Sequence, residues 1–173
     1  LTPGFTCTAT AGTTSGATQS QVAGPCGGNA NDDVWYRFTA GAANQTITVV
    51  GTCATFNAVV EVYSGASCAA LTYVNCANVT GAGGTETLAL TGLIGGANYY
   101  IRIYDAGTCY AGCAGNSFTV CVVTPSNDLC ANATTVVCGG SYSGCTLNTA
   151  ACGFITGTGD IPTTTPCGTA STS

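Results

Sequence analysis

The sequence predicts an all-β fold, a jelly roll or β-sandwich over residues 1–124, followed by a C-terminal β extension over residues 125–173. Apolar residues make up 46% of the chain, yet they occur in short runs separated by Gly, Thr, Ser and Asn. Seven of these runs are rich in β-branched and aromatic residues, at the spacing typical of sandwich folds. The 25 glycines are spread throughout, and no stretch keeps a period of 3.6 residues for three turns, so helices are not expected.

The predicted strands follow one another between residues 33 and 123. The first, residues 33–39 (DVWYRFT), alternates and carries aromatic and β-branched side chains. The others are residues 46–50 (TITVV), 58–63 (AVVEVY), 71–74 (LTYV), 86–90 (ETLAL), 99–104 (YYIRIY) and 117–123 (SFTVCVV). Glycine-rich or Asn-rich turns separate several of them, which favours a sandwich of short strands.

After residue 124 the strand-like pattern gives way to turn-forming residues. The string TPSND at residues 124–128 indicates a linker or tight turn. Two motifs of the N-terminal region then recur, PCG of residues 25–27 at 166–168 and SGAT of residues 15–18 as SGCT. Either composition alone produces these matches, or residues 125–173 are the opening segment of a following repeat. We expect the second. Because this segment has too few strands for a core, it should pack on, or complement with a strand, a neighbouring module.

Thirteen cysteines and the absence of His predict disulfides, and therefore a secreted or cell-surface protein, rather than zinc sites. Local closures are expected first, with one weaker long-range pair. The predicted pairs are Cys68–Cys76, Cys109–Cys113, Cys130–Cys138 and Cys53–Cys121. The count is odd, so one thiol lacks a partner within the chain, and Cys7 is predicted to be free or bonded to a neighbouring chain. Because the printed sequence opens at Leu1 without a leader, we expect a processed mature chain or a fragment of a longer array.

Charged residues make up only 5% of the chain, and the only cations are Arg37 and Arg102. Nucleic acid and anionic membrane surfaces are excluded as partners, because both require clusters of Lys and Arg. No run of about 18 apolar residues occurs, so membrane insertion is not expected. Without His or Lys, the nucleophile–base pairs Ser-His, Cys-His and Ser-Lys are impossible. The chain is therefore predicted not to be an enzyme.

The acidic residues leave one weak cofactor hypothesis. Asp33 and Asp105 lie at strand ends and are candidates for calcium ligation, since Ca²⁺ prefers carboxylate and loop carbonyl oxygens. No calcium-loop motif of the DxDxDG type is present, and such residues also form turns without any ion. We therefore expect no resident cofactor, with calcium as the alternative.

Glycans are a second expected attachment. Three N-glycosylation motifs begin at Asn44, Asn78 and Asn132, each in or beside a predicted turn. The PTTTP string places Thr163, Thr164 and Thr165 in a setting typical of O-glycosylated stalks. A surface so poor in charge needs another source of solubility, which attached glycans supply.

Aromatic side chains raise the question of a sugar-binding platform, although core and cross-strand packing is the expected role of most of them. The candidates are Trp35, Tyr36, Tyr99, Tyr100 and Tyr104.

Several strings together resemble one known family. They are NDDVWYRFTA, EVYSGASC, ETLALTGLIGGANYYIRIYD and SFTVCV, followed by NDLCANATTVVCGGSYSG, which reads as the start of a further repeat. This set resembles the pre-peptidase C-terminal-like jelly-roll domains that occur in tandem in large secreted proteins of Bacteroidota-type bacteria. The resemblance covers residues 30–124 as one body, and it implies an accessory, adhesive or spacer role with no catalytic residues. The high Thr and Cys content and the lack of Lys depart from the family's usual composition.

The composition, the motifs and the resemblance are compatible with two functions. The first is a structural subunit of an extracellular filament or tandem-repeat fibre, in which copies of the chain join head to tail by β-strand complementation and carry glycans. The second is a secreted accessory module that binds carbohydrate or a cell surface beside a larger protein.

Overall fold

The structure is a computed structural model that describes residues 1–107, 116–125, 142–143 and 154–155. The chain divides into two compact units, Leu1–Thr124 and Pro125–Ser173. In the second unit the description is limited to β9 (Tyr142–Ser143) and β10 (Phe154–Ile155), which pair antiparallel. The role of this unit as the opening segment of a following repeat stays a prediction.

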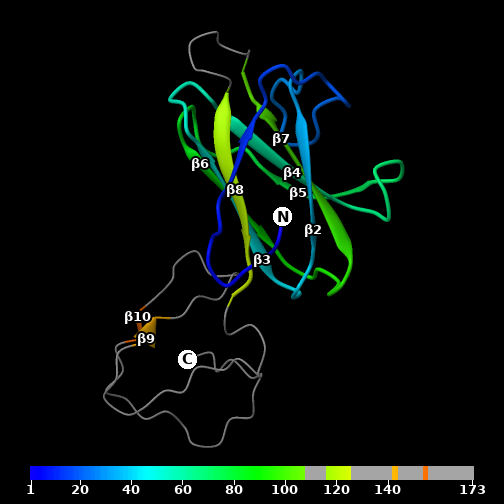
Figure 1. The fold of residues 1–173 in the computed structure, drawn as a ribbon, viewed down its shortest axis with the longest axis vertical. Helices are drawn as coiled ribbons and strands as arrows, with labels where there is room; N and C mark the ends of the chain where they lie inside the picture. The colour runs from blue at the N-terminus through cyan, green and yellow to red at the C-terminus, as the bar shows by residue number, and fades with distance from the viewer. Residues whose placement is uncertain (108–115, 126–141, 144–153, 156–173) are drawn as a thin grey trace, which may run out of the picture. The chain divides into compact units, whose positions relative to one another are not determined.

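The first unit is a β-sandwich, as predicted (Figure 1). One four-stranded sheet, here the β3 sheet, has the order β1-β8-β3-β6, and the other, the β4 sheet, has the order β2-β7-β4-β5. The strands are β1 (Thr10–Thr13), β2 (Val34–Thr39), β3 (Gln45–Gly51), β4 (Ala58–Ser64), β5 (Thr72–Ala77), β6 (Thr85–Leu90), β7 (Asn98–Asp105) and β8 (Ser117–Val123). Every ladder between them is antiparallel.

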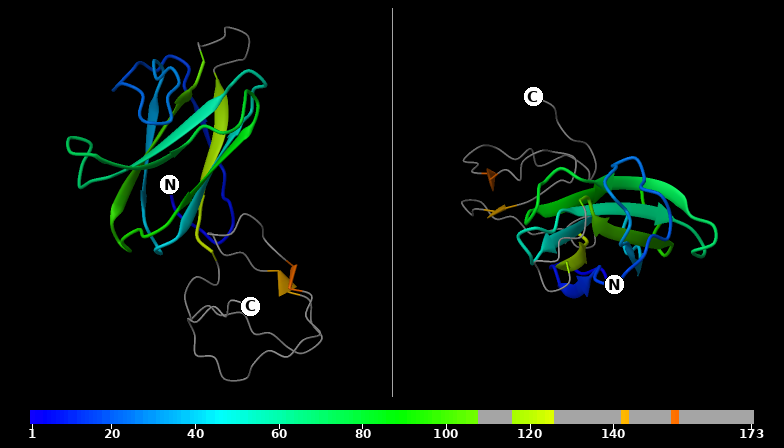
Figure 2. Two further views of the ribbon diagram at one scale, coloured as in Figure 1. Left: turned by 180° about the vertical axis from the view of Figure 1, so that it is seen from behind. Right: turned by 90° about the horizontal axis from the view of Figure 1, so that it is seen from above.

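The strand order is that of a jelly roll. The chain changes sheet at each connection in this unit except β4 to β5, which is a hairpin within one sheet. The two sheets therefore form two layers, which Figure 2 shows from behind and from above. Residues 65–71, which connect β4 to β5, project from the body of the sandwich as a loop.

The core fills the space between the layers and follows the alternation of the strands. Ile47 and Val49 point inward from β3, Ile101 and Ile103 from β7, and each is fully buried. Phe56 stacks on Phe118 with 5.6 Å between ring centroids. β4 is buried on both faces as far as Tyr63, because another part of the chain covers its outer side.

Strand β1 was not predicted, because its sequence TAGT has little strand propensity. It forms because β8 offers it a ladder, in which Thr10 faces Val120 and Thr13 faces Ser117. Gly12 permits the close approach of the strand. A Cβ at this position would lie 2.6 Å from the Phe118 ring and closer still to the Tyr36 hydroxyl oxygen.

The chain between β1 and β2 covers the outer face of the β4 sheet. We call residues 14–31 the N-terminal cover. Ala30 of the cover packs with Val59 and Tyr104 in a small second core on this outer face. The cover thereby explains why outward-facing positions of β4 and β7 are buried, and it frames the polar site described next.

Candidate functional site

All five acidic side chains that the structure describes are buried. Arg102 is buried as well, which leaves Arg37 as the only exposed charged side chain in the part of the chain described. The buried acids are Asp32, Asp33, Glu61, Glu86 and Asp105. Buried charges require partners, so the contacts of these groups show what the site does.

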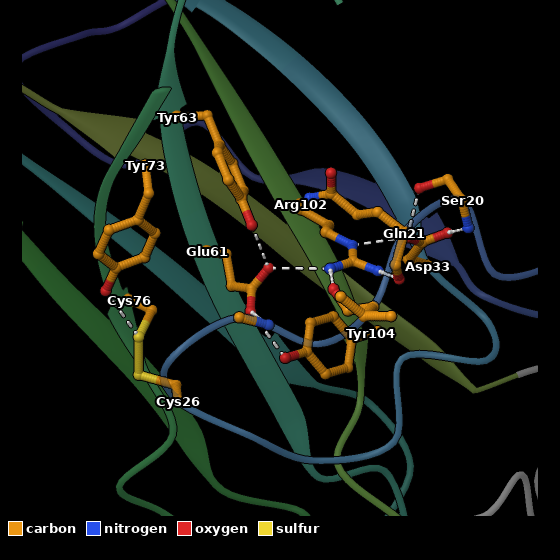
Figure 3. A network of polar contacts seen from close by, with 12 residues as sticks. Ser20, Gln21, Cys26, Asp33, Glu61, Tyr63, Tyr73, Cys76, Arg102 and Tyr104 are labelled. Atoms are coloured by element: carbon orange, nitrogen blue, oxygen red, sulfur yellow. Dashed lines mark hydrogen bonds and ion pairs between the residues drawn. A yellow bond between two sulfur atoms is a disulfide. The ribbon is translucent and has the colours of Figure 1, made fainter. Parts of the chain in front are cut away.

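The candidate site is centred on one row of residues that crosses the β4 sheet. Trp35 of β2 lies opposite Arg102 of β7, Arg102 lies opposite Glu61 of β4, and Glu61 lies opposite Cys76 of β5. Directly opposite residues share a face of the sheet. All four side chains therefore project from the outer face, toward the N-terminal cover. Figure 3 shows Arg102, Glu61 and Cys76 of this row.

Arg102 binds both carboxylates and the cover. Its Nε lies 2.5 Å from Asp33 Oδ2 and its Nη1 lies 3.0 Å from Glu61 Oε2. Nη1 also donates to the Val22 carbonyl at 2.9 Å, and Nη2 donates to the Gln21 carbonyl. Burial by itself lowers the pKa of the guanidinium, but the hydrogen bonds to Asp33 and Glu61 raise it above its ordinary value. Arg102 thus stays charged and fastens the cover to the sheet.

Glu61 accepts hydrogen bonds on both oxygens. Oε2 receives the Tyr63 hydroxyl at 2.8 Å in addition to Arg102. Oε1 receives the backbone N–H of Gly24 at 2.6 Å and lies 2.9 Å from the Tyr104 hydroxyl. Burial, followed by the hydrogen bond to Glu61, raises the pKa of Tyr63 to about 12 and raises that of Tyr104 further. Both phenols are therefore neutral donors at ordinary pH.

Asp33 forms the other end of the network. Its Oδ1 accepts the backbone N–H of Ser20 at 3.0 Å, and its Oδ2 accepts the Ser20 hydroxyl at 2.5 Å. The Trp35 indole N–H donates to the same Ser20 hydroxyl at 3.0 Å, while its ring lies 5.8 Å from the Arg102 guanidinium carbon. The only tryptophan of the chain is therefore in contact with the cover.

A disulfide closes the other side of the cover. Cys26 of the cover bonds Cys76 of β5, with a Cα–Cα distance of 6.0 Å. The Asn78 side-chain amide donates to the Cys26 carbonyl at 3.0 Å. The network holds residues 20–24 of the cover by polar contacts, and the disulfide holds Cys26 beside them by a covalent bond.

This arrangement binds the protein to itself and presents no reactive group. Asp33 and Glu61 are each engaged on both oxygens, and their side chains have no exposed surface. A general acid or nucleophile needs access to a substrate, which these carboxylates lack. Their chemistry is that of a buried ion-pair network with neutral tyrosine donors.

The two calcium candidates lie in different settings. Asp33 is held by Arg102 and Ser20, whereas Asp105 accepts the backbone N–H groups of Asn57 and Gly107. Burial raises the pKa of the Asp105 carboxyl. Among the described residues, no group of three or more His, Cys, Asp or Glu side chains is placed to share a metal ion. Calcium binding stays an untested prediction.

Comparisons with known proteins add one structural likeness. The chain is similar to a solved bacterial domain. That domain is the pre-peptidase C-terminal domain of a collagenase from Bacillus anthracis, with a TM-score of 0.44 and 14% sequence identity, over 70% of this chain and 91% of that one. No family model matches the sequence, and no curated protein matches it either. The likeness concerns fold alone, and the sandwich itself rests on the ladders described above. No helix in the described ranges is long and apolar enough to cross a membrane.

Three disulfide predictions were wrong. Cys76 bonds Cys26, so it does not pair with Cys68, which is a free, exposed thiol. Cys7 bonds Cys121, 114 positions further along the chain, so Cys7 is neither free nor intermolecular. The pair Cys53–Cys121 is therefore excluded as well, although Cys53 is itself disulfide-bonded.

These errors have one physical cause. Proximity in sequence favours local closure only in an unfolded chain, whereas here the sandwich brings the N-terminal segment beside β8 and the cover beside β5. The predicted pairs Cys109–Cys113 and Cys130–Cys138 lie outside the described residues.

Of the glycosylation candidates, the structure describes two. Asn44 is half-buried in the turn before β3. Asn78 is half-buried, and its amide nitrogen, the atom a glycan would modify, donates to Cys26. Asn132, Thr163, Thr164 and Thr165 lie outside the described residues. Glycosylation stays a prediction at all of these positions.

The aromatic candidates serve mainly as packing. Tyr99, Tyr100 and Tyr104 are buried, and Trp35 and Tyr36 are half-buried. They belong to both faces of the β4 sheet, since Tyr99 packs in the core against Phe38 while Tyr104 packs under the cover. The five therefore do not form one exposed platform.

The Arg102 network was missed at the level of sequence. A signal was available, since Glu61 and Arg102 each interrupt an otherwise apolar strand, in AVVEVY and YYIRIY. Opposite charges within two such strands indicate a buried ion pair.

Proposed function

We propose that this chain is a structural module of an extracellular filament or tandem-repeat fibre, joined head to tail by β-strand complementation and carrying glycans. We also propose that it is not an enzyme. One observation carries the proposal: the described unit uses all of its acids and Arg102 internally and leaves Arg37 as its only exposed charged side chain.

Such a surface is unusual for a free monomer. Soluble domains commonly keep about a quarter to a third of their surface residues charged, which prevents association. On β6 the exposed positions are instead hydroxyl-bearing or small, namely Thr85, Thr87 and Ala89, and large apolar side chains such as Val22, Val79 and Ile94 are exposed elsewhere. Burial against neighbouring modules and a coat of glycans both suit a surface of this kind.

The disulfides support an extracellular location. Cys7–Cys121 and Cys26–Cys76 close loops of 114 and 50 residues. Structural disulfides of this kind persist in oxidising compartments. A chain-entropy model gives about 5 and about 4 kcal/mol of stabilisation respectively, which suits a module that experiences tension or dilution outside the cell.

Electron microscopy and sedimentation of the full chain test the assembly. Over a rising concentration series we expect linear polymers whose repeat is one module long. Compact monomers at every concentration would refute the filament proposal. Intact mass compared before and after chemical deglycosylation tests the glycans. A mass equal to that of the bare polypeptide would remove that part of the proposal.

A binding module is the second candidate, and one observation favours it. Trp35, Tyr63 and Tyr73 form a chain of ring contacts on the outer face of the β4 sheet, with centroid distances of 5.5 and 5.9 Å. Exposed Arg37 lies on the same face, two residues from Trp35. Glycan-array binding that is lost in Tyr73→Ala and retained in Thr39→Ala would support this function over the first.

A further inference from the structure

The edges of the two sheets differ in how far they are protected. An edge strand presents unpaired N–H and C=O groups, and natural proteins block such edges with short strands, charges, irregular pairing or covering segments. Within the described part of the chain, the edges are β1 and β6 in the β3 sheet, and β2 and β5 in the β4 sheet.

Three of these edges carry a blocking feature. β1 is only four residues long. β2 carries the exposed, charged side chain of Arg37. The backbone carbonyl of Arg37 also accepts a hydrogen bond from the backbone nitrogen of Leu1. On β5 the pairing with β4 shifts register beside Tyr63. The backbone N–H of Cys76 donates a hydrogen bond to the Asn75 side-chain oxygen. A disulfide also joins β5 to the N-terminal cover.

β6 lacks these features. It has six residues, its exposed positions are Thr85, Thr87 and Ala89, and its ladder with β3 is regular from Thr85 to Leu90. The strand contains neither proline nor an exposed charge.

The open groups of β6 can be assigned from its pairing. The N–H of Gly51 donates to the Gly84 carbonyl, which makes that opposed pair a hydrogen-bonded one. Hydrogen-bonded and non-bonded pairs alternate in antiparallel ladders. Glu86, Leu88 and Leu90 therefore bond to β3. The N–H and C=O groups of Thr85, Thr87 and Ala89 point to the open edge.

Glu86 does not act as a deterrent at this edge. An inward-pointing charge on an edge strand discourages pairing when a new strand would bury it. The Glu86 carboxylate is already fully buried, and it accepts the N–H groups of Val79 and Thr80 and the Thr80 hydroxyl. An added strand therefore imposes no new desolvation on this group.

We infer that β6 is the acceptor edge of the proposed assembly, and that its occupant is an extended strand from residues 133–137 of a second copy. This inference rests on the proposed filament function. The sequence of those residues, ATTVV, contains the longest β-branched run after Pro125 and carries no charge, which matches the uncharged face of β6. Because the donor and acceptor are different surfaces, the contact is heterologous, and it propagates as an open chain when the rotation between successive copies does not close a ring.

An extended donor strand is compatible with only some disulfide pairings of Cys130 and Cys138. Residues 133–137 cannot be extended if Cys130 and Cys138 are bonded to each other, because a disulfide holds its Cα atoms about 5.5 Å apart. Both described disulfides join distant parts of the chain, 114 and 50 residues apart. The donor strand therefore requires that these two cysteines have other partners.

Thr87→Pro in the full chain is the decisive variant. Proline removes the outward N–H of residue 87 and leaves the bonds of Glu86 and Leu88 to β3 intact, and proline is tolerated on edge strands. Thr87→Val is the matched control, since it keeps the N–H and the β-branched shape. Near-ultraviolet circular dichroism of both variants should match the parent, which shows that the sandwich is retained.

Two measurements distinguish the assignment of β6 as acceptor edge from the proposal that the chain forms filaments. The first is sedimentation of the parent, Thr87→Pro and Thr87→Val over one concentration series. The second is the binding of a labelled synthetic peptide, residues 131–139 with Ser in place of Cys138, to the same three full-length proteins. We expect polymers of the parent and Thr87→Val but not of Thr87→Pro, and peptide affinity weakened at least about tenfold in Thr87→Pro alone.

The outcomes are distinguishable. If the parent forms no polymers, the proposed function fails, while peptide binding that is sensitive to Thr87→Pro still supports the acceptor edge. Polymers of Thr87→Pro equal to those of the parent overturn the acceptor edge and leave the filament standing. Failure of the peptide to bind the parent, or a Cys130–Cys138 bond in the assembled protein, overturns the donor assignment.

Discussion

Replacing Arg102 with Met is the most informative single change in the sandwich. Methionine has a similar length and fills the space without a charge. The substitution leaves Asp33 and Glu61 buried without their shared cation, because both side chains have no exposed surface. It also leaves the Gln21 and Val22 carbonyls without their donor.

The expected cost follows from this geometry. Removing one partner of a buried ion pair typically costs about 3–5 kcal/mol, because an uncompensated charge stays in the interior. A domain of this size has a free energy of unfolding of about 5–15 kcal/mol. With a urea dependence of about 2 kcal/mol per molar, the unfolding midpoint of Arg102→Met should fall by about 2 M.

Urea unfolding with the disulfides intact, followed by fluorescence, measures this loss. Trp35 is the only tryptophan in the chain and contacts both Ser20 and Arg102. Release of the N-terminal cover should therefore shift its emission to longer wavelength before global unfolding. A broad-specificity protease should also cut within residues 20–25 sooner than in the parent.

Arg37→Met is the matched control, since Arg37 is an exposed arginine on the adjacent strand β2. It should change stability by less than about 0.5 kcal/mol. Adding Asp33→Asn and Glu61→Gln to Arg102→Met should recover part of the loss, because no buried charge then remains unpaired. A loss below about 1 kcal/mol for Arg102→Met would refute the role of the network in fastening the cover.

Three further predictions follow from the same structure. Gly12→Ala should destabilise the sandwich by about 1–3 kcal/mol, because the added Cβ would overpack against Tyr36 and Phe118. Gly95→Ala should not, because a Cβ at that position meets no atom within 4 Å. Equal thermal unfolding midpoints for the two variants would contradict this prediction. Burial raises the pKa of the Asp105 carboxyl in the folded protein above its value in the unfolded chain. Protonated Asp105 therefore favours the folded state. This contribution to the free energy of unfolding is complete below the unfolded pKa of about 3.9 and is lost as the pH rises through the folded pKa. Asp105→Asn should therefore be at least as stable as the parent at neutral pH, with a gain that vanishes in acid, and a deficit at neutral pH measured by urea unfolding would argue otherwise. Cys68 should be alkylated by iodoacetamide in the native protein, and peptide mapping that finds Cys68 protected would show that the disulfide arrangement is different.

The strands that the sequence predicted are those whose side chains alternate or form runs of apolar β-branched and aromatic residues. Residues 46–50 and 86–90 alternate between core and surface, whereas residues 58–63 and 99–104 are such apolar runs. Both signals are local. β1 was not recognisable, since TAGT forms a strand only because β8 offers it a ladder. The edge properties of β6 likewise depend on which strand lies beside it.

The sequence by itself determined that the chain builds an oxidised sandwich of short strands without His- or Lys-based catalysis. Composition and period-two alternation are properties of neighbouring residues, and they decide which face of each strand avoids water. The tertiary structure alone decided the disulfide partners, and it alone brought Arg102 between Asp33 and Glu61. Those contacts join residues 41 to 114 positions apart. No local pattern encodes them, because the jelly-roll crossovers bring such residues together only when both sheets have formed.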